Sequence, residues 1–165
     1  MLTNHAKIMQ FFSMADGVTG RKKLQKMIYI LQKCNIPFEE KYHFHVYGPY
    51  SEELTLRVEE LCNFGFLDET KEDKSNYFQY NYTITTDGAA FLQQFNLDMP
   101  SYQNKVDMLK ERSSRFLELV STMLYFDDLP IEETIEKVHT VKPKQKFSEN
   151  EIEEAIQFIK DIKQP

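Results

Sequence analysis

The sequence contains no tryptophan and has two cysteines, five glycines and six prolines in 165 residues. Cys34 and Cys62 cannot build the disulfide framework of a small secreted protein, and they form no Cys-x-x-Cys pair. We expect both thiols to pack as small apolar side chains in a reducing compartment. With 41% hydrophobic residues and little glycine or proline, the chain is neither low-complexity nor disordered.

Long hydrophobic runs are also missing. No apolar run approaches the roughly 18 residues that a membrane-spanning helix needs, and the first five residues open no basic-then-apolar signal segment. We therefore expect a cytoplasmic protein without membrane contact. Its length suits one compact domain, or a small domain with an added helical piece.

The charge is acidic, with 26 acidic against 20 basic residues and a formal net charge of -6. This balance argues against indiscriminate binding to nucleic acids, although the placement of charges matters more than their sum. The G-x-S-x-G, P-loop, H-E-x-x-H and G-x-G-x-x-G patterns are absent from the sequence. We therefore predict no catalytic residue, no metal and no cofactor.

Apolar spacing gives the expected elements. A 3.6-residue period predicts helices in the first part of the chain over residues 3–15, 21–33, 52–64 and 89–95. Alternation around 43–47 predicts a short strand, and Gly48-Pro49 predicts a tight turn after it. Residues 66–70 and 77–84 predict a hairpin with one apolar side.

The order helix, helix, strand, helix, hairpin is typical of a winged helix-turn-helix domain. We therefore predict an α+β, mainly α fold with such a domain over residues 1–97. Residues 98–165 predict a C-terminal helical region, with a helix over 102–126, another over 131–139 and a last one capped by Ser148. We expect this region to pack on the first domain or on a second subunit of a homodimer.

In a winged-helix protein the helix before the hairpin enters the DNA major groove, and here that helix is residues 52–64. Its outward side carries polar and mostly acidic side chains around one leucine, Leu56: Glu52, Glu59, Glu60 and Asn63. Such a face repels the phosphates that normally supply most of the affinity for DNA. Leu56 is instead a candidate for protein contact, although single surface leucines commonly need no role.

The second predicted helix is basic. Lys22, Lys26, Tyr29 and Lys33 are expected on its outward side, with Arg21 beside its start. Such a stripe suits an acidic protein surface or, as the weaker alternative, a nucleic-acid backbone. The simplest interpretation is a solvated face whose lysine stems cover apolar surface. These five residues are our candidates for partner binding.

Two histidines, His43 and His45, lie two residues apart on the expected strand and therefore share a face. A metal site would need further ligands from His5, Cys34 or Cys62. Histidines beside aromatic residues more often pack than bind metal, so no metal site is predicted.

Three segments carry a family resemblance: residues 20–29 (GRKKLQKMIY), 47–54 (YGPYSEEL) and 65–67 (GFL). With these segments the chain resembles the YwgA family of Firmicute bacteria over nearly its whole length. The resemblance implies a winged-helix-like fold and no assigned catalytic residue. Residues 23–29 and Gly48-Pro49 are also similar to the SocA-like (Panacea) antitoxin domain, which often has a tryptophan just before this turn.

The turn formed by Tyr47, Gly48, Pro49 and Tyr50 directly precedes a helix N-terminus, which can hold an anion. This turn could form a pocket wall with polar residues of the second helix: Lys23, Gln25 and Lys26, beside Tyr29. Alternatively, the turn only fixes the entry to the third helix.

Taken together, these patterns predict a non-catalytic binding or regulatory module with an unidentified protein partner, antitoxin-like at most. A DNA-binding regulator that uses the second helix and a dimer is the alternative.

Overall fold

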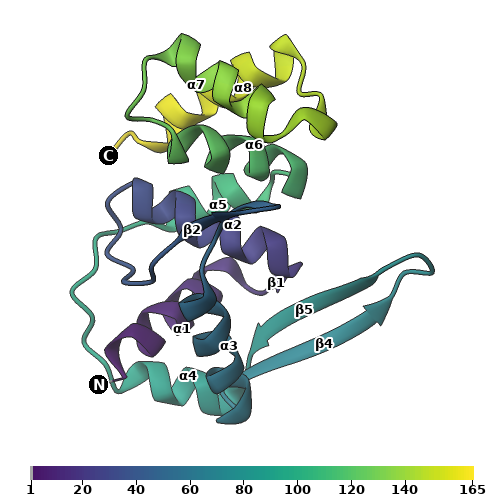
Figure 1. The fold of residues 1–165 in the computed structure, drawn as a ribbon. Coiled ribbons are helices and arrows are strands. Elements are labelled where there is room, and N and C mark those ends of the chain that lie inside the picture. Colours follow the sequence, from purple (N-terminus) through teal and green to yellow (C-terminus); the bar gives the residue numbers. More distant parts are fainter. Residues whose placement is uncertain (1) are drawn as a thin grey trace.

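Helices dominate the computed structural model, which describes residues 2–165 and is an α+β fold with small antiparallel sheets (Figure 1). The helices are α1 (Thr3–Ala15), α2 (Arg21–Lys33), α3 (Glu52–Asn63), α4 (Thr86–Gln93), α5 (Gln103–Lys110), α6 (Ser114–Tyr125), α7 (Ile131–Val141), the 3₁₀ turn η1 (Pro143–Gln145) and α8 (Glu149–Ile162). The strands are β1 (Val18–Thr19), β2 (His43–His45), β3 (Gly48–Tyr50), β4 (Leu67–Asp73) and β5 (Phe78–Ile84).

Several helix boundaries follow the sequence signals closely. The predicted bounds of α1 and α2 are confirmed. Helix α3 begins after Ser51, whose side chain accepts a hydrogen bond from the backbone N–H of Leu54. Ser148 and Glu151 form the predicted capping box at the start of α8, each side chain accepting from the other residue's backbone N–H.

The prediction of a tight turn at Gly48-Pro49 is wrong. Both residues belong to β3, which pairs with β2 so that Phe44 lies opposite Pro49, and the loop consists of Val46 and Tyr47. A proline is tolerated in a two-stranded sheet because every strand there is an edge. Gly48 adopts a φ of +92°, which a residue with a side chain rarely adopts.

The predicted single helix over 102–126 is also wrong, because the chain breaks between α5 and α6. Ser113 has an extended backbone, and its hydroxyl accepts from the N–H of Phe116, so it caps a new helix. The two helices then cover different partners. Helix α5 packs on α1 and α2, whereas α6 packs on α2, β3, α7 and α8.

The strand order of the larger sheet is β1-β5-β4. The two-residue strand β1 was not predicted, since a segment this short has no periodicity; it pairs Val18 with Tyr82. Beyond this pairing β4 and β5 run on as a hairpin that projects from the helices (Figure 1). Helix α4 starts at Thr86, three residues earlier than predicted, because the Thr85 hydroxyl accepts from the N–H of Gly88.

One continuous apolar core joins the N-terminal helices to α5 and α6, and α7 and α8 lie beyond α6 at the top of Figure 1. The largest set of contacts between two helices is the one between α2 and α6. No helix in the described part of the chain is both long and apolar enough for a bilayer.

Candidate functional site

The polar side chains of α2 hold the β2–β3 hairpin and the start of α3. Gln25 is buried, and its Nε2 donates to the carbonyl of Ser51 at 2.9 Å and to Oγ1 of Thr55 at 3.0 Å. Its Oε1 accepts from the Ser51 N–H at 2.8 Å. Gln25 and the Ser51 cap therefore use N–H groups at the start of α3, where Glu52 and Glu53 also fill the first turn. An anion at this N-terminus receives no support from this geometry.

Lys26 lies in the interior, with only 2% of its surface exposed, so its predicted outward position is wrong. Its Nζ donates to the carbonyl of Pro49 at 2.8 Å. A Cβ at Gly48 would lie 3.6 Å from this Nζ and 3.4 Å from Oγ1 of Thr122, so the glycine allows the hairpin to pass close over the lysine. Burial lowers the pKa of Lys26 to about 8; the carboxylate of Glu118 raises it, and the charges of Lys142 and Lys22 lower it.

Two more ionic side chains are buried beside Lys26. Glu118 of α6 and Lys142, the residue after α7, approach to 3.7 Å between Oε2 and Nζ. Lys142 also donates to the carbonyl of Val46 in the β2–β3 loop. Burial lowers the pKa of Lys142, whereas the carboxylate of Glu118 raises it. We call Lys26, Glu118 and Lys142 the Lys26 cluster; it joins α2, the hairpin and the C-terminal helices.

The other candidates on α2 do not form a basic stripe. Tyr29, also predicted outward, is 6% exposed and packs between Tyr42 and Tyr125, with ring centroids 4.9 and 6.3 Å away. Burial raises its pKa. Lys33 pairs with Asp127 at 3.2 Å. The prediction that this side of α2 faces solvent is wrong, because α6 covers it.

Arg21 and Lys22 are the exposed members of the predicted basic set. Arg21 contacts the Glu69 carboxylate at 3.3 Å and donates to the Tyr82 hydroxyl at 3.2 Å. Lys22 forms no ion pair with a described residue, and its Nζ lies 3.5 Å from the ring centre of Tyr47.

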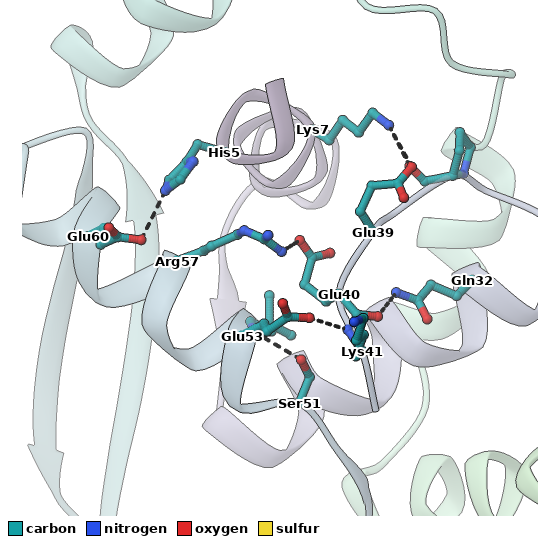
Figure 2. A network of polar contacts seen from close by, with 12 residues as sticks. His5, Lys7, Gln32, Glu39, Glu40, Lys41, Ser51, Glu53, Arg57 and Glu60 are labelled. Atoms are coloured by element: carbon teal, nitrogen blue, oxygen red, sulfur yellow. Dashed lines mark hydrogen bonds and ion pairs between the residues drawn. The ribbon is translucent and has the colours of Figure 1, made fainter. Parts of the chain in front are cut away.

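The outward face of α3 is as predicted. Leu56 is 57% exposed, and Glu52, Glu59 and Asn63 are exposed around it, with Glu60 half-buried. Figure 2 shows polar contacts that anchor other side chains of α3, including the ion pair between Arg57 and the buried Glu40.

Glu60 is also anchored, because its Oε1 lies 3.1 Å from Nε2 of His5 on α1 (Figure 2). Glu52 and Glu59 form no ion pair with any of residues 2–165. We call Glu52, Leu56, Glu59 and Asn63 the acidic face of α3.

Histidine and cysteine chemistry gains no geometric support. His43 and His45 are both exposed, and residues 2–165 contain no group of three or more His, Cys, Asp or Glu placed to hold a metal ion. Both thiols are half-buried. Burial and neighbouring carboxylates raise the pKa of Cys62 to about 11, and burial also raises that of Cys34, so neither is an activated nucleophile.

Two cavities flank Lys22 and Lys26. One, of about 180 Å³, lies where the two sequence motifs meet, and Gln25, Tyr47 and Tyr50 also line it. The other, of about 190 Å³, lies toward the start of α6 and is lined by the following residues: Lys22, Lys26, Ser114, Arg115, Glu118 and Gln145. Lys23, the remaining predicted wall residue, lines a different cavity beside Lys110.

Comparison with known proteins places the chain in a family. No family model matches it. It is 59% identical over 164 residues to a Bacillus subtilis (strain 168) protein with the name uncharacterized protein YwgA, and the match covers 99% of both chains. The chain belongs to the YwgA family. The resemblance carried by residues 20–29 and 47–54 is thereby confirmed.

Two buried charged residues of this YwgA-family chain, Glu118 and Lys142, are not predicted from the sequence. Glu118 stands among Leu117, Leu119 and Val120, and a charged residue inside such an apolar stretch was an available signal for a buried charge. Lys142 gave no such signal, because the sequence does not show that it returns to the β2–β3 loop.

Proposed function

We propose that this YwgA-family protein is a non-catalytic, protein-binding module built on a winged helix-turn-helix. The order α1, α2, α3, then the β4–β5 hairpin, with β1 as third strand, supports this fold for residues up to 97. Residues 98–165 would form its helical extension.

Two features argue against DNA as the partner. The acidic face of α3 would meet phosphates if α3 entered the major groove, and like charges there weaken binding. On α2, the buried Lys26 and Tyr29 and the paired Lys33 leave no basic stripe for the alternative mode. The hairpin adds no net positive charge, since Lys71 and Lys74 are balanced by Glu72 and Asp73.

The observation that carries the proposal is the exposure of Leu56 between the unpaired carboxylates of Glu52 and Glu59. An apolar centre with a charged rim is the usual anatomy of a protein-binding surface. Its sign predicts a partner with a basic rim around an apolar contact. A regulatory or antitoxin-like role would act through the same face.

The test compares the full-length protein with Leu56→Asp, after isolation from its native cells and identification of stoichiometric partners by mass spectrometry. Ile131→Asp at the start of α7 is the matched control, because Ile131 is also exposed. We expect the partner to be lost with Leu56→Asp and kept with Ile131→Asp, with both variants unfolding at the wild-type temperature. Retention of the partner by Leu56→Asp, or steeply salt-dependent binding of DNA in its place, would contradict the proposal.

A further inference from the structure

The cavity at the start of α6 carries more positive charge than its own residues neutralise. Of its three cations, Arg115 is held by Glu151 and Gln145 at 2.8 to 3.1 Å. Lys22 and Lys26 remain, and the single carboxylate of the lining, Glu118, is shared with Lys142. Lys26 is buried, and a buried cation is costly unless an anion compensates it, whereas the exposed Lys22 adds a second positive charge at the lining. This cavity therefore favours an anionic ligand.

Both the buried ammonium and the buried carboxylate of this cavity retain unused hydrogen-bonding capacity. An ammonium has three N–H donors, and Lys26 uses one of them on Pro49. Glu118 is nine-tenths buried, yet its Oε2 accepts no hydrogen bond from residues 2–165. The ammonium of Lys142 lies 3.7 Å from this oxygen, beyond hydrogen-bond distance, so the carboxylate keeps free acceptor capacity. A ligand that offers acceptors to the lysines and one proton to the carboxylate fits this lining.

We propose that this cavity binds inorganic hydrogen phosphate, with Lys22 and Lys26 donating to its oxygens and Glu118 accepting its P–OH. Hydrogen phosphate meets both requirements, because it is an anion that keeps a hydroxyl at neutral pH. Sulfate has the same shape but no proton, so it would face the Glu118 carboxylate with a lone pair. The dianion of a phosphate monoester lacks the proton as well.

The size of the cavity agrees with a small ion. Its volume of about 190 Å³ is well above the space that a single water molecule needs. This space accepts one tetrahedral oxyanion with a few waters.

The experiment is isothermal titration of the full-length protein, in a phosphate-free buffer, with phosphate, sulfate and methyl phosphate. We expect one phosphate per chain and at least ~10-fold weaker binding of the other two ions, equivalent to the ~1.4 kcal/mol of a lost hydrogen bond to a charged group. Lys22→Ala should weaken phosphate binding about 10-fold without affecting folding, since Lys22 is exposed. Lys71→Ala, which removes an exposed charge from the hairpin, is the matched control and should leave phosphate binding unchanged.

Glu118→Gln provides the sharpest arm, because an amide can donate to an oxyanion. We expect this variant to bind sulfate and phosphate with similar affinity. The proposal would be overturned by no binding of phosphate, by equal binding of sulfate by the wild type, or by equal losses in Lys22→Ala and Lys71→Ala. Tighter binding of methyl phosphate would also overturn it, and would indicate a phosphorylated partner as the ligand.

Discussion

Helices α1 and α2 are both buried, but by different kinds of contact. The inner side of α1 is apolar: Ile8, Met9, Phe11 and Phe12 are fully buried among other apolar side chains. Helix α2 contributes apolar residues to the same core and also buries Gln25 and Lys26 against the β2–β3 hairpin, α3 and α6. Apolar packing dominates the α1 interface, whereas the α2 interface combines apolar packing with buried hydrogen bonds and charge.

The two interfaces therefore lose stability in response to different changes. An apolar interface loses stability when volume is added or removed, and it is insensitive to pH. A polar interface responds to the loss of single donors and to protonation, because each buried polar group depends on its partner. Near neutral pH, solution conditions and small ions can therefore act more strongly on the buried Lys26 of the α2 side than on the apolar contacts of α1.

The strongest test of the α1 side is Gly88→Ala in α4. An added Cβ would lie 2.1 Å from the carbonyl oxygen of Phe66 and 2.7 Å from Cε of Met9. Alanine normally favours a helix, but here the backbone oxygen cannot yield cheaply. We expect a loss of more than about 3 kcal/mol of unfolding free energy in urea denaturation.

Ala90→Leu is the matched control, since it adds more volume at an exposed position of the same helix. It should change the unfolding free energy by less than about 0.5 kcal/mol. If Gly88→Ala were as mild as this control, the α1 side would not be fixed by shape.

On the α2 side, Gln25→Leu keeps the side-chain volume and removes the hydrogen bonds of Gln25 to Ser51 and Thr55. The fully buried N–H of Ser51 loses its acceptor, whereas the Ser51 carbonyl still accepts from Thr55. We expect a loss of about 2–3 kcal/mol by the same denaturation measurement. Gln93→Leu, at an exposed site on α4, should be nearly neutral. A neutral Gln25→Leu would mean that packing alone holds the hairpin and α3 in place.

The same contrast explains how far the sequence predicts the structure. The apolar periodicity of α1 and the face of α3 around Leu56 are local patterns, and both predictions are confirmed. Lys26 was misplaced because lysine in a helix normally points to solvent, and nothing local shows that α6 covers this side. The break between α5 and α6 was missed because Val106 and Leu117 fit one stripe in sequence although they belong to separate helices.

The smallest expected effect is a rise in stability with pH, which arises on the α2 side. The pKa of Lys26 is about 8 in the folded protein and near its ordinary 10.5 when unfolded, so the unfolded chain binds more protons between these values. Stability is therefore lowest below pH 8 and rises above it, and the lowered pKa of Lys142 acts in the same direction. The raised pKa values of Cys62 and Cys34 oppose this rise, because from about pH 9 the unfolded chain loses thiol protons that the folded chain keeps. We therefore expect a net gain of less than about 1 kcal/mol from pH 8 to about 9.5 in urea denaturation.

The rise in stability with pH ends where the buried tyrosines Tyr29, Tyr82 and Tyr102 begin to titrate in the unfolded chain. Burial raises their pKa values, so above pH ~10 the unfolded chain loses phenolic protons that the folded chain keeps, and stability falls. Lys26→Met should remove most of the rise below that point, whereas Lys71→Met on the exposed hairpin should retain it. If the rise persisted in full in Lys26→Met, the pH response would belong to other lysines, and the Lys26 cluster would not distinguish the two sides.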